Sequence, residues 1–308
     1  MMEQGAAPTT SRGASFWGKP RRIGTAQRRL RRFVRRRPLG AAGLAVVLLW
    51  VVLAVAAPLA TPGHDPYTQD YTVALQAPGA DGWLGTDRFG RDQYARVVYG
   101  SRISLVIAFT AVGIGGTLGL VAGVVSGYIG RWVDGLLMRL ADILLAFPGL
   151  LLALALIAVL GTGADKIIIA LTVISAPWMM RVIRAQTLST KQNLYIEAAR
   201  AVGASSGRIM MRHILPNVLP SYLIIATSLL GFFILMEATL SFLGLGVPLP
   251  DPSWGGMLSG SAQESAQTAP WLVLFPGIAI TTLVMGFNLL GDALRDLWDP
   301  RLRGGPTG

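Results

Sequence analysis

Long apolar stretches without charged residues alternate with shorter polar segments along the chain. A helix that crosses the ~30 Å hydrocarbon core of a bilayer needs about 20 predominantly apolar residues. Five uncharged stretches reach or nearly reach this length: 41–60, 103–130, 143–164, 218–236 and 265–291. The pattern predicts that each stretch forms a membrane-spanning helix.

A sixth apolar stretch, 167–180, is shorter and lies between Lys166 and Arg181. As a helix it would cover only about 21 Å. Lysine and arginine side chains at its two ends can reach the membrane interfaces and complete the crossing. We therefore predict an all-α integral membrane protein with six transmembrane helices, of which the fourth has the shortest apolar stretch.

The composition supports a membrane protein and excludes several kinds of site. Only 14% of the residues are charged, whereas soluble domains average about 25%. The chain has no cysteine, which excludes disulfides, iron–sulfur clusters and zinc–thiolate sites. The only histidines are His64 and His213, so we also expect no multi-histidine metal site.

No motif for catalysis or nucleotide binding is present. A P-loop requires the pattern G-x-x-x-x-G-K-[ST], and none of the three lysines, Lys19, Lys166 and Lys191, lies in that context. No HExxH, paired-carboxylate or nucleophile–base motif occurs either. We therefore expect a non-catalytic chain that binds no cofactor and no metal, so that any energy comes from a partner or an ion gradient.

Basic residues are distributed unevenly between the two sets of loops. With the N-terminus inside, the inside segments hold 22 Lys and Arg residues and the outside segments hold 5. The positive-inside rule describes this asymmetry. We therefore predict that both termini are cytoplasmic and that segments 61–102 and 247–270 are extracytoplasmic.

Residues 1–40 form a tail with 11 Lys and Arg residues. We interpret it as a cytoplasmic anchor to anionic lipid, each basic residue near the surface contributing about 1 kcal/mol. An RNA-binding arm and an Arg-rich organellar transit peptide are the alternatives. The span at 41–60 is longer than the core of a signal peptide and leads into further spans, so we expect it to be retained.

The second span contains glycines at every fourth position, which therefore share one helix face. They are Gly115, Gly119, Gly123 and Gly127. Small residues in this register allow another helix to approach closely, because lipid supplies no hydrophobic drive for helix pairing. The ridge fits packing within the subunit or contact with a partner subunit, and the pattern alone does not separate the two.

Glu237 is the only acidic residue well inside a predicted span. Carboxylates within membranes are costly and often functional. It fits a place along a translocation pathway or a hydrogen bond within the bundle. Asp142, three residues after Arg139 at the inner end of the third span, fits a satisfied interfacial ion.

The polar segment between the fourth and fifth spans carries several charges but lacks the composition of a simple turn. Its apolar residues from 194 to 202 share one helical face: Leu194, Tyr195, Ala198, Ala199 and Val202. Gly203 can adopt positive φ and end this helix, and Ser205 or Ser206 can cap a second one from Arg208. The pattern predicts a helix–glycine–helix knob that docks a partner.

The segment EAARAVGASSGRIMMRHILP, 197–216, resembles the cytoplasmic EAA loop of permease subunits of bacterial ABC importers. Its matching positions are Glu197, Ala198, Ala199, Gly203, Leu215 and Pro216, whereas His213 stands where the pattern has isoleucine. Further stretches are similar to the C-type subunit of the dipeptide/oligopeptide/nickel permease family. They are WLGTDRFGRD (83–92), MRLADILLAFPGLLLALAL (138–156), EATLSFLGLGVPLPDPSWGGML (237–258) and FNLLGDALRDLWDPRLR (287–303).

The resemblance implies a type I ABC importer permease fold in the bacterial cell membrane. The core would comprise residues 103–292, with a peripheral span at 41–60 and a cytoplasmic C-terminal tail at 293–308. The coupling loop, about 187–217, would fit into a cleft of a cytoplasmic ATPase. The loop residues that it implicates are Glu197, Ala198, Ala199, Gly203, Ala204, Ser205, Arg208, Leu215 and Pro216.

The resemblance also implies partners and a cargo. The partners are a second, B-type permease in a heterodimer, one or two ABC ATPase subunits, an extracytoplasmic binding protein and the lipid bilayer, with no nucleic acid. ATP and Mg²⁺ would be bound by the ATPase subunits. Short peptides are the implied cargo, with nickel chelates or glutathione-like ligands as alternatives.

Two hypotheses from other classes compete with an importer subunit. An ion-coupled secondary transporter or channel would favour inverted repeats and several intramembrane charges, which the sequence does not show. A structural membrane scaffold or receptor would need no coupling loop.

Overall fold

The computed structural model describes residues 37–79 and 82–298. The chain divides into Met1–Pro38 and Leu39–Gly308, and the fold below is that of the second unit. The basic tail at 1–40 and the last residues of the C-terminal tail at 293–308 lie mostly outside the described residues. In the described part, helices are the regular elements, connected by turns and irregular loops, and one isolated bridge joins Thr86 and Asp92.

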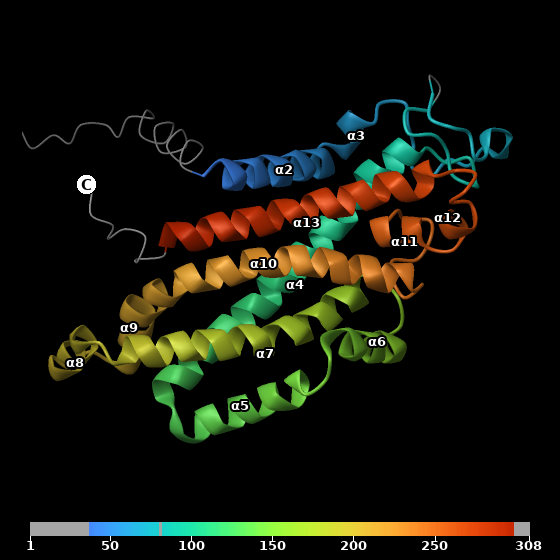
Figure 1. The fold of residues 1–308 in the computed structure, drawn as a ribbon. Coiled ribbons are helices and arrows are strands. Elements are labelled where there is room, and N and C mark those ends of the chain that lie inside the picture. Colours follow the sequence, from blue (N-terminus) through green and yellow to red (C-terminus); the bar gives the residue numbers. More distant parts are fainter. Residues whose placement is uncertain (1–36, 80–81, 299–308) are drawn as a thin grey trace, which may run out of the picture. The chain divides into compact units, whose positions relative to one another are not determined.

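Long helices run alongside one another, and short helices lie at both of their ends (Figure 1). The long helices are α2 (Pro38–Val55), α4 (Gln93–Ile129), α5 (Arg131–Leu145), α6 (Gly149–Leu160), α7 (Ala164–Lys191), α10 (Leu215–Phe242) and α13 (Trp271–Trp298). The short ones are α3 (Ala57–Ala60), η1 (Tyr71–Val73), α8 (Leu194–Ala201), α9 (Ser206–Ile209), the π-helix η2 (Met210–Ile214), α11 (Trp254–Leu258) and α12 (Ser261–Glu264).

The number of candidate spans agrees with the sequence prediction. Within the described residues, five helices are long and apolar enough to cross a membrane, the fourth of them running from Ser206 to Phe242. The pair α5 and α6 passes the same test together but is bent by 87°. Counted as one broken span, this pair brings the number to six.

The third span differs from the predicted uncharged stretch 143–164. Its helix already begins at Arg131, stops at Leu145, and continues as α6 from Gly149. Pro148 explains the break, because proline has no N–H to donate and disfavours helical geometry in the residue before it. The helix also holds four charged residues that a search for uncharged stretches excludes: Arg131, Asp134, Arg139 and Asp142.

The fourth span is longer than its apolar stretch of 167–180 because its basic residues find partners. Arg184 Nη2 donates to Asp134 Oδ2 at 2.6 Å, and Arg181 Nη2 donates to Asp142 Oδ1 at 2.6 Å. Both carboxylates come from α5. The partner of Asp142 is therefore Arg181 on the neighbouring helix, not Arg139 on its own.

The glycine ridge of α4 packs against α7. A Cβ atom added to Gly119 would lie 2.5 Å from the carbonyl oxygen of Ala176, and one added to Gly123 would lie 2.7 Å from that of Met180. Gly115 and Gly127 face Thr172 and Thr187 of α7 in the same way. This geometry is packing within the subunit, the first of the two interpretations of the ridge.

The first span, predicted at 41–60, begins at Pro38 and lies beside α13 (Figure 1). Trp50 Nε1 donates to Thr282 Oγ1 of α13 at 3.1 Å. Only 22% of the residues of α2 are buried, so α2 is a peripheral helix. The sequence predicts that the segment 61–102 lies wholly before the second span. Its last ten residues instead belong to α4, which already starts at Gln93.

Candidate functional site

The segment between α7 and α10 forms the predicted helix–glycine–helix knob. It comprises α8, Gly203, α9 and η2 (residues 194–214), and it lies at one end of the long helices (Figure 1). Gly203 has φ +79°, a conformation that favours glycine. Ser205 caps α9, its Oγ accepting from the Arg208 N–H at 3.4 Å. The glycine and the cap thus set the angle between the two short helices.

The knob is fixed to the long helices by isoleucines. Ile196, Ile209 and Ile214 are fully buried in one apolar cluster with residues of α4, α7 and α10, among them Val124 and Ile183. Just before the knob, Lys191 Nζ at the end of α7 donates to the Tyr128 carbonyl oxygen of α4 at 2.7 Å. The knob therefore packs directly against three long helices, and densely packed interiors leave little room to absorb a displacement.

The opposite face of the knob is exposed and apolar. Leu194 and Val202 expose 81% and 85% of their surface, and Met211 exposes 67%. Most of the apolar face predicted from 194–202 therefore points outward. Ala199 is the exception, because it packs beside the fully buried Ile196 against the core cluster. A cluster of exposed large apolar side chains marks an interaction surface.

The sequence-predicted loop residues surround this face. Glu197, Ala198, Gly203, Ser205, Arg208 and Pro216 are exposed, while Ala199, Ala204 and Leu215 are partly buried. Each is therefore either on the exposed surface or directly beneath it.

The π-helix η2 was not predicted from the sequence. It places His213, the departure from the EAA pattern, with its ring centroid 6.3 Å from that of Tyr195 in α8. Asn217 Nδ2 donates to the His213 carbonyl oxygen at 2.6 Å. Pro216 follows at once and cannot donate a helical hydrogen bond, which is the one signal in the sequence for irregular geometry here. The π-helix is the last part of the knob and continues directly into α10.

Glu237 of α10 lies inside the bundle. It has no exposed surface and accepts from Ser104 Oγ and from Ser241 Oγ, both at 2.8 Å. This arrangement is a hydrogen bond within the bundle, one of the two interpretations of this residue. Its place along a pathway stays a prediction.

An apolar groove of about 420 Å³ lies at the α5–α6 break, between α5, α6, α7 and α10. Three of its aromatic residues, Phe147, Trp178 and Phe232, expose 57%, 44% and 49% of their surface. A Cβ atom on Gly149 would lie 3.5 Å from Ile174 Cγ2, and Ile174 is at the centre of the apolar stretch of α7. The break therefore lies beside the middle of the apolar stretch of α7.

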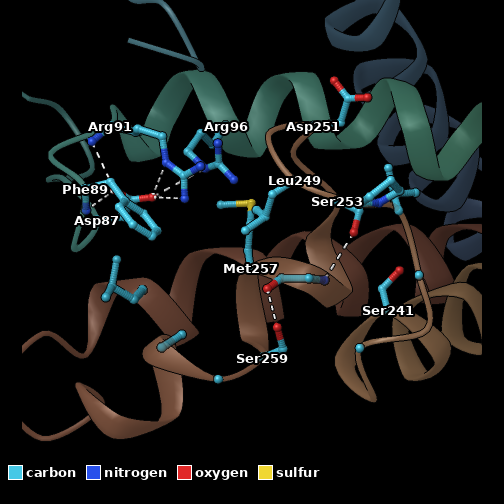
Figure 2. Close-up of a pocket in the computed structure, with 18 of the residues that line it drawn as sticks. Asp87, Phe89, Arg91, Arg96, Ser241, Leu249, Asp251, Ser253, Met257 and Ser259 are labelled. Carbon is cyan, nitrogen blue, oxygen red and sulfur yellow. Dashed lines mark hydrogen bonds and ion pairs between the residues drawn. The ribbon is translucent and has the colours of Figure 1, made fainter. Parts of the chain in front are cut away.

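A second cavity, of about 330 Å³, lies at the other end of the helices from the knob and is called the arginine cavity here (Figure 2). Its walls come from residues 87–96, from the end of α10 and from the segment 244–262 that contains α11. Its charged residues are Asp87, Arg88, Arg91, Arg96 and Asp251.

Asp87 holds the turn before α4 together. Its Oδ1 accepts from the backbone N–H groups of Phe89 at 2.8 Å and Arg91 at 3.0 Å. Its Oδ2 accepts from Arg91 Nε at 2.7 Å and lies 2.7 Å from Arg91 Nη2. Charge-assisted hydrogen bonds of this kind are the strong ones in proteins, so this turn is rigid.

Arg96 joins two segments that are far apart in the sequence. Its Nη1 donates to the Pro66 carbonyl oxygen at 2.9 Å and to that of Pro250 at 3.4 Å. Tyr67 donates to Asp251 Oδ1 at 3.1 Å beside it. The stretch WLGTDRFGRD contains Arg88 and Arg91, and Arg96 follows four residues after its end. The sequence contains no indication that segment 247–253 lies against Arg96.

Two known families match two separate parts of the chain. The family described as "Binding-protein-dependent transport system inner membrane component" matches residues 119–304. The family described as "N-terminal TM domain of oligopeptide transport permease C" matches residues 25–78. The matched regions together contain the first span, the last part of α4, the knob and the long helices that follow α4.

Several relatives are similar over most of their length. A dipeptide transport system permease protein of Alkalihalophilus pseudofirmus is 43% identical over 270 residues, 88% of each chain. A glutathione transport system permease protein of Pectobacterium atrosepticum is 41% identical, over 89% of this chain and 90% of that protein. A putative peptide transport system permease protein of Brucella suis is 44% identical, over 89% and 91%.

These matches confirm the resemblance seen in the sequence, the all-helical membrane fold and the location in the inner membrane. The knob and the broken third span are therefore features of a permease. The chain belongs to the family of binding-protein-dependent transport system inner membrane components.

Proposed function

We propose that this chain is one of two permease subunits of an ATP-driven importer for short peptides. The observation that carries the proposal is the knob, which is anchored by buried isoleucines and exposes Leu194, Val202 and Met211. A partner that grips this face can move α4, α7 and α10 together. The relatives described above, whose names specify dipeptide, peptide and glutathione transport, support the cargo class.

The partner at the knob is a cytoplasmic ABC ATPase, one or two subunits of which bind ATP and Mg²⁺. This chain has no P-loop and is not itself an enzyme in our proposal. ATP binding shifts the ATPase between two states, and the knob transfers that shift to the spans, so the pathway favours one of its own two states. This places the knob and both termini in the cytoplasm, as the distribution of 22 and 5 basic residues favours.

The second permease covers the face with the apolar groove. Residues Ala146, Phe147 and Pro148 are exposed in this chain although they form irregular backbone beside the middle of the apolar stretch of α7. Irregular backbone within the hydrocarbon region is tolerated only when it is buried in protein or lines a water-filled cavity. We infer that the groove lines the pathway between the two permeases. An extracytoplasmic binding protein delivers the peptide from the opposite end to the knob.

Reconstitution tests this function. The complex of both permeases, the ATPase subunits and the binding protein is placed in liposomes and supplied with ATP and a peptide mixture. We expect peptide uptake that stops without ATP or without the ATPase subunits. Uptake that continues without them would reject an ATP-driven importer. Uptake of a nickel chelate that peptides do not compete with would agree with the ATP-driven mechanism but reject peptides as the cargo. Exclusive uptake of glutathione would restrict the cargo to that peptide.

A further inference from the structure

The arginine cavity has more buried positive charge than negative charge. Arg91 and Arg96 expose only 5% and 3% of their surface, and Asp87 exposes 9%. Asp87 is occupied by Arg91 and by two backbone N–H groups. Arg96 Nε is 3.7 Å from the same carboxylate, beyond hydrogen-bond distance. One buried carboxylate thus faces two buried guanidinium groups.

The short hydrogen bonds of Arg96 go to neutral groups. They end on the carbonyl oxygens of Pro66 and Pro250. The other carboxylate of the cavity, Asp251, is exposed and accepts from Tyr67. A buried charge without a full countercharge is costly, and an anion that enters the cavity would reduce that cost.

The remaining walls of the cavity suit an anion that carries an apolar group. Val247, Leu249 and Met257 line it, and Figure 2 shows Leu249 and Met257 near the arginines. Its volume of about 330 Å³ is at the lower end of the range for small-ligand pockets, roughly 300–1,000 Å³. One amino-acid residue with its carboxylate fits this space.

The position of the cavity connects it with the proposed pathway. Thr162, between α6 and α7, and Ser241 and Gly244, at the end of α10, line it. The same three helices line the apolar groove farther along the bundle. A peptide that enters from the end opposite the knob would meet the arginine cavity before the groove.

We propose that the arginine cavity binds the C-terminal carboxylate of the peptide as it leaves the binding protein, through Arg96, while Leu249 and Met257 contact the last side chain. The planar guanidinium matches a carboxylate in shape and charge. This inference rests on the proposed function, because it assumes that peptides are the cargo.

The test compares two forms of one peptide in the reconstituted complex with saturating binding protein. The probes are the peptide that wild type imports best and its C-terminal amide. A hydrogen bond to a charged group contributes about 1.5–3 kcal/mol, so we expect the amide to be imported at least about tenfold less well. In Arg96→Gln we expect the ratio of free-peptide uptake to amide uptake to fall to about one. In Arg96→Lys we expect this ratio to be partly restored. Arg102→Gln, an exposed arginine on the same helix, should keep the wild-type ratio.

A second variant pair guards against misfolding, since Arg96 also braces two loops. Leu249 exposes 66% of its surface, so Leu249→Asp and Leu249→Asn are expected to assemble equally well. Both variants lose the apolar contact of Leu249 with the last side chain, so we expect lower uptake of the free peptide and of the amide in each. The asparagine, which has nearly the same shape as the aspartate without the charge, should keep the wild-type ratio of free-peptide uptake to amide uptake. Relative to the asparagine, the aspartate should reduce uptake of the free peptide several-fold further and should not further reduce uptake of the amide.

Three results would overturn the inference. The first is an unchanged ratio in both Arg96→Gln and Leu249→Asp. The second concerns the concentration of binding protein that stimulates ATP hydrolysis half-maximally. If both variants need a higher concentration than wild type, whichever peptide is present, the cavity would instead bind an acidic group of the binding protein. The third is no ATP-dependent peptide uptake by wild type, which would reject the proposed function itself and this inference with it.

Discussion

Glycine residues of α4 decide how closely this helix approaches α7. At Gly123 an added Cβ atom would lie 2.7 Å from the Met180 carbonyl oxygen, whereas at Gly113 it would meet nothing within 4 Å. Both residues are on the same helix, so they differ mainly in what they face. This difference makes them a matched pair for measuring how much the close contact between α4 and α7 contributes to stability.

We predict that Gly123→Ala destabilises the protein and that Gly113→Ala does not. Overpacking of a close contact costs about 1–3 kcal/mol, while alanine in an open helical position is neutral or slightly favourable. Thermal unfolding of the purified complex in detergent measures the effect. Equal unfolding temperatures for the two variants would show that α4 and α7 do not pack through this ridge.

Glu237 provides a second prediction at the residue level. Glu237→Gln should keep hydrogen bonds to Ser104 and Ser241 and leave assembly unchanged. Glu237→Leu removes the acceptor of two hydroxyl groups in a buried place, and each unsatisfied polar group costs about 1–3 kcal/mol. Unfolding measurements separate the variants. A large loss of uptake in a stable Glu237→Gln complex would favour the pathway interpretation over a purely structural one.

Among the elements, the knob combines a rigid attachment with an exposed apolar face. Its angle depends on Gly203, whose φ of +79° proline cannot adopt, because its ring holds φ near −65°. Gly207, also in the knob, has open space around its Cβ position and no positive φ. Glu197 is exposed, so we expect a change there to affect contact with a partner more than folding.

We predict that Gly203→Pro and Glu197→Arg leave the subunit inserted but uncouple ATP hydrolysis from uptake. Gly207→Ala is the control that should transport normally. The measurement is the number of ATP molecules hydrolysed per peptide imported by the reconstituted complex, which should rise several-fold in the first two variants. Wild-type transport rates in both would show that the knob is not the coupling element.

The orientation of the whole molecule is defined by which end of the bundle faces the cytoplasm. The native chain has no cysteine, so single cysteines report their position without background. Ser205 lies in the knob, and Gln263 lies in α12 at the other end; both are exposed. The two positions therefore report on the two ends of the bundle, and both side chains are accessible to a reagent on their own side.

We predict that a membrane-impermeant thiol reagent labels Gln263→Cys in intact cells but labels Ser205→Cys only after the membrane is opened. The physical reason is the excess of basic residues on the knob side, which the positive-inside rule assigns to the cytoplasm. The reverse labelling pattern would invert the topology and remove the knob from the reach of a cytoplasmic ATPase.

Local properties of the chain could be predicted from the sequence. Span number follows from the length of apolar stretches, and the turn at Gly203 and the cap at Ser205 follow from the conformational preferences of single residues. The EAA pattern and the stretches around it identified the family. Each of these signals is contained within a short segment, so no knowledge of distant contacts was needed.

The tertiary structure decided what depends on partners far away in the chain. Arg139 and Asp142 lie within a helix that the apolar pattern starts at 143, and Asp142 is balanced there by Arg181 of α7. The knob exposes most of its predicted apolar face because Ile196 supplies its fully buried contact with the core, while only Ala199 of that face packs against the same cluster. The arginine cavity brings Arg96 to Pro250 across 154 positions. Charge compensation and burial are properties of neighbours in space, and no local pattern in the sequence states which neighbours those are.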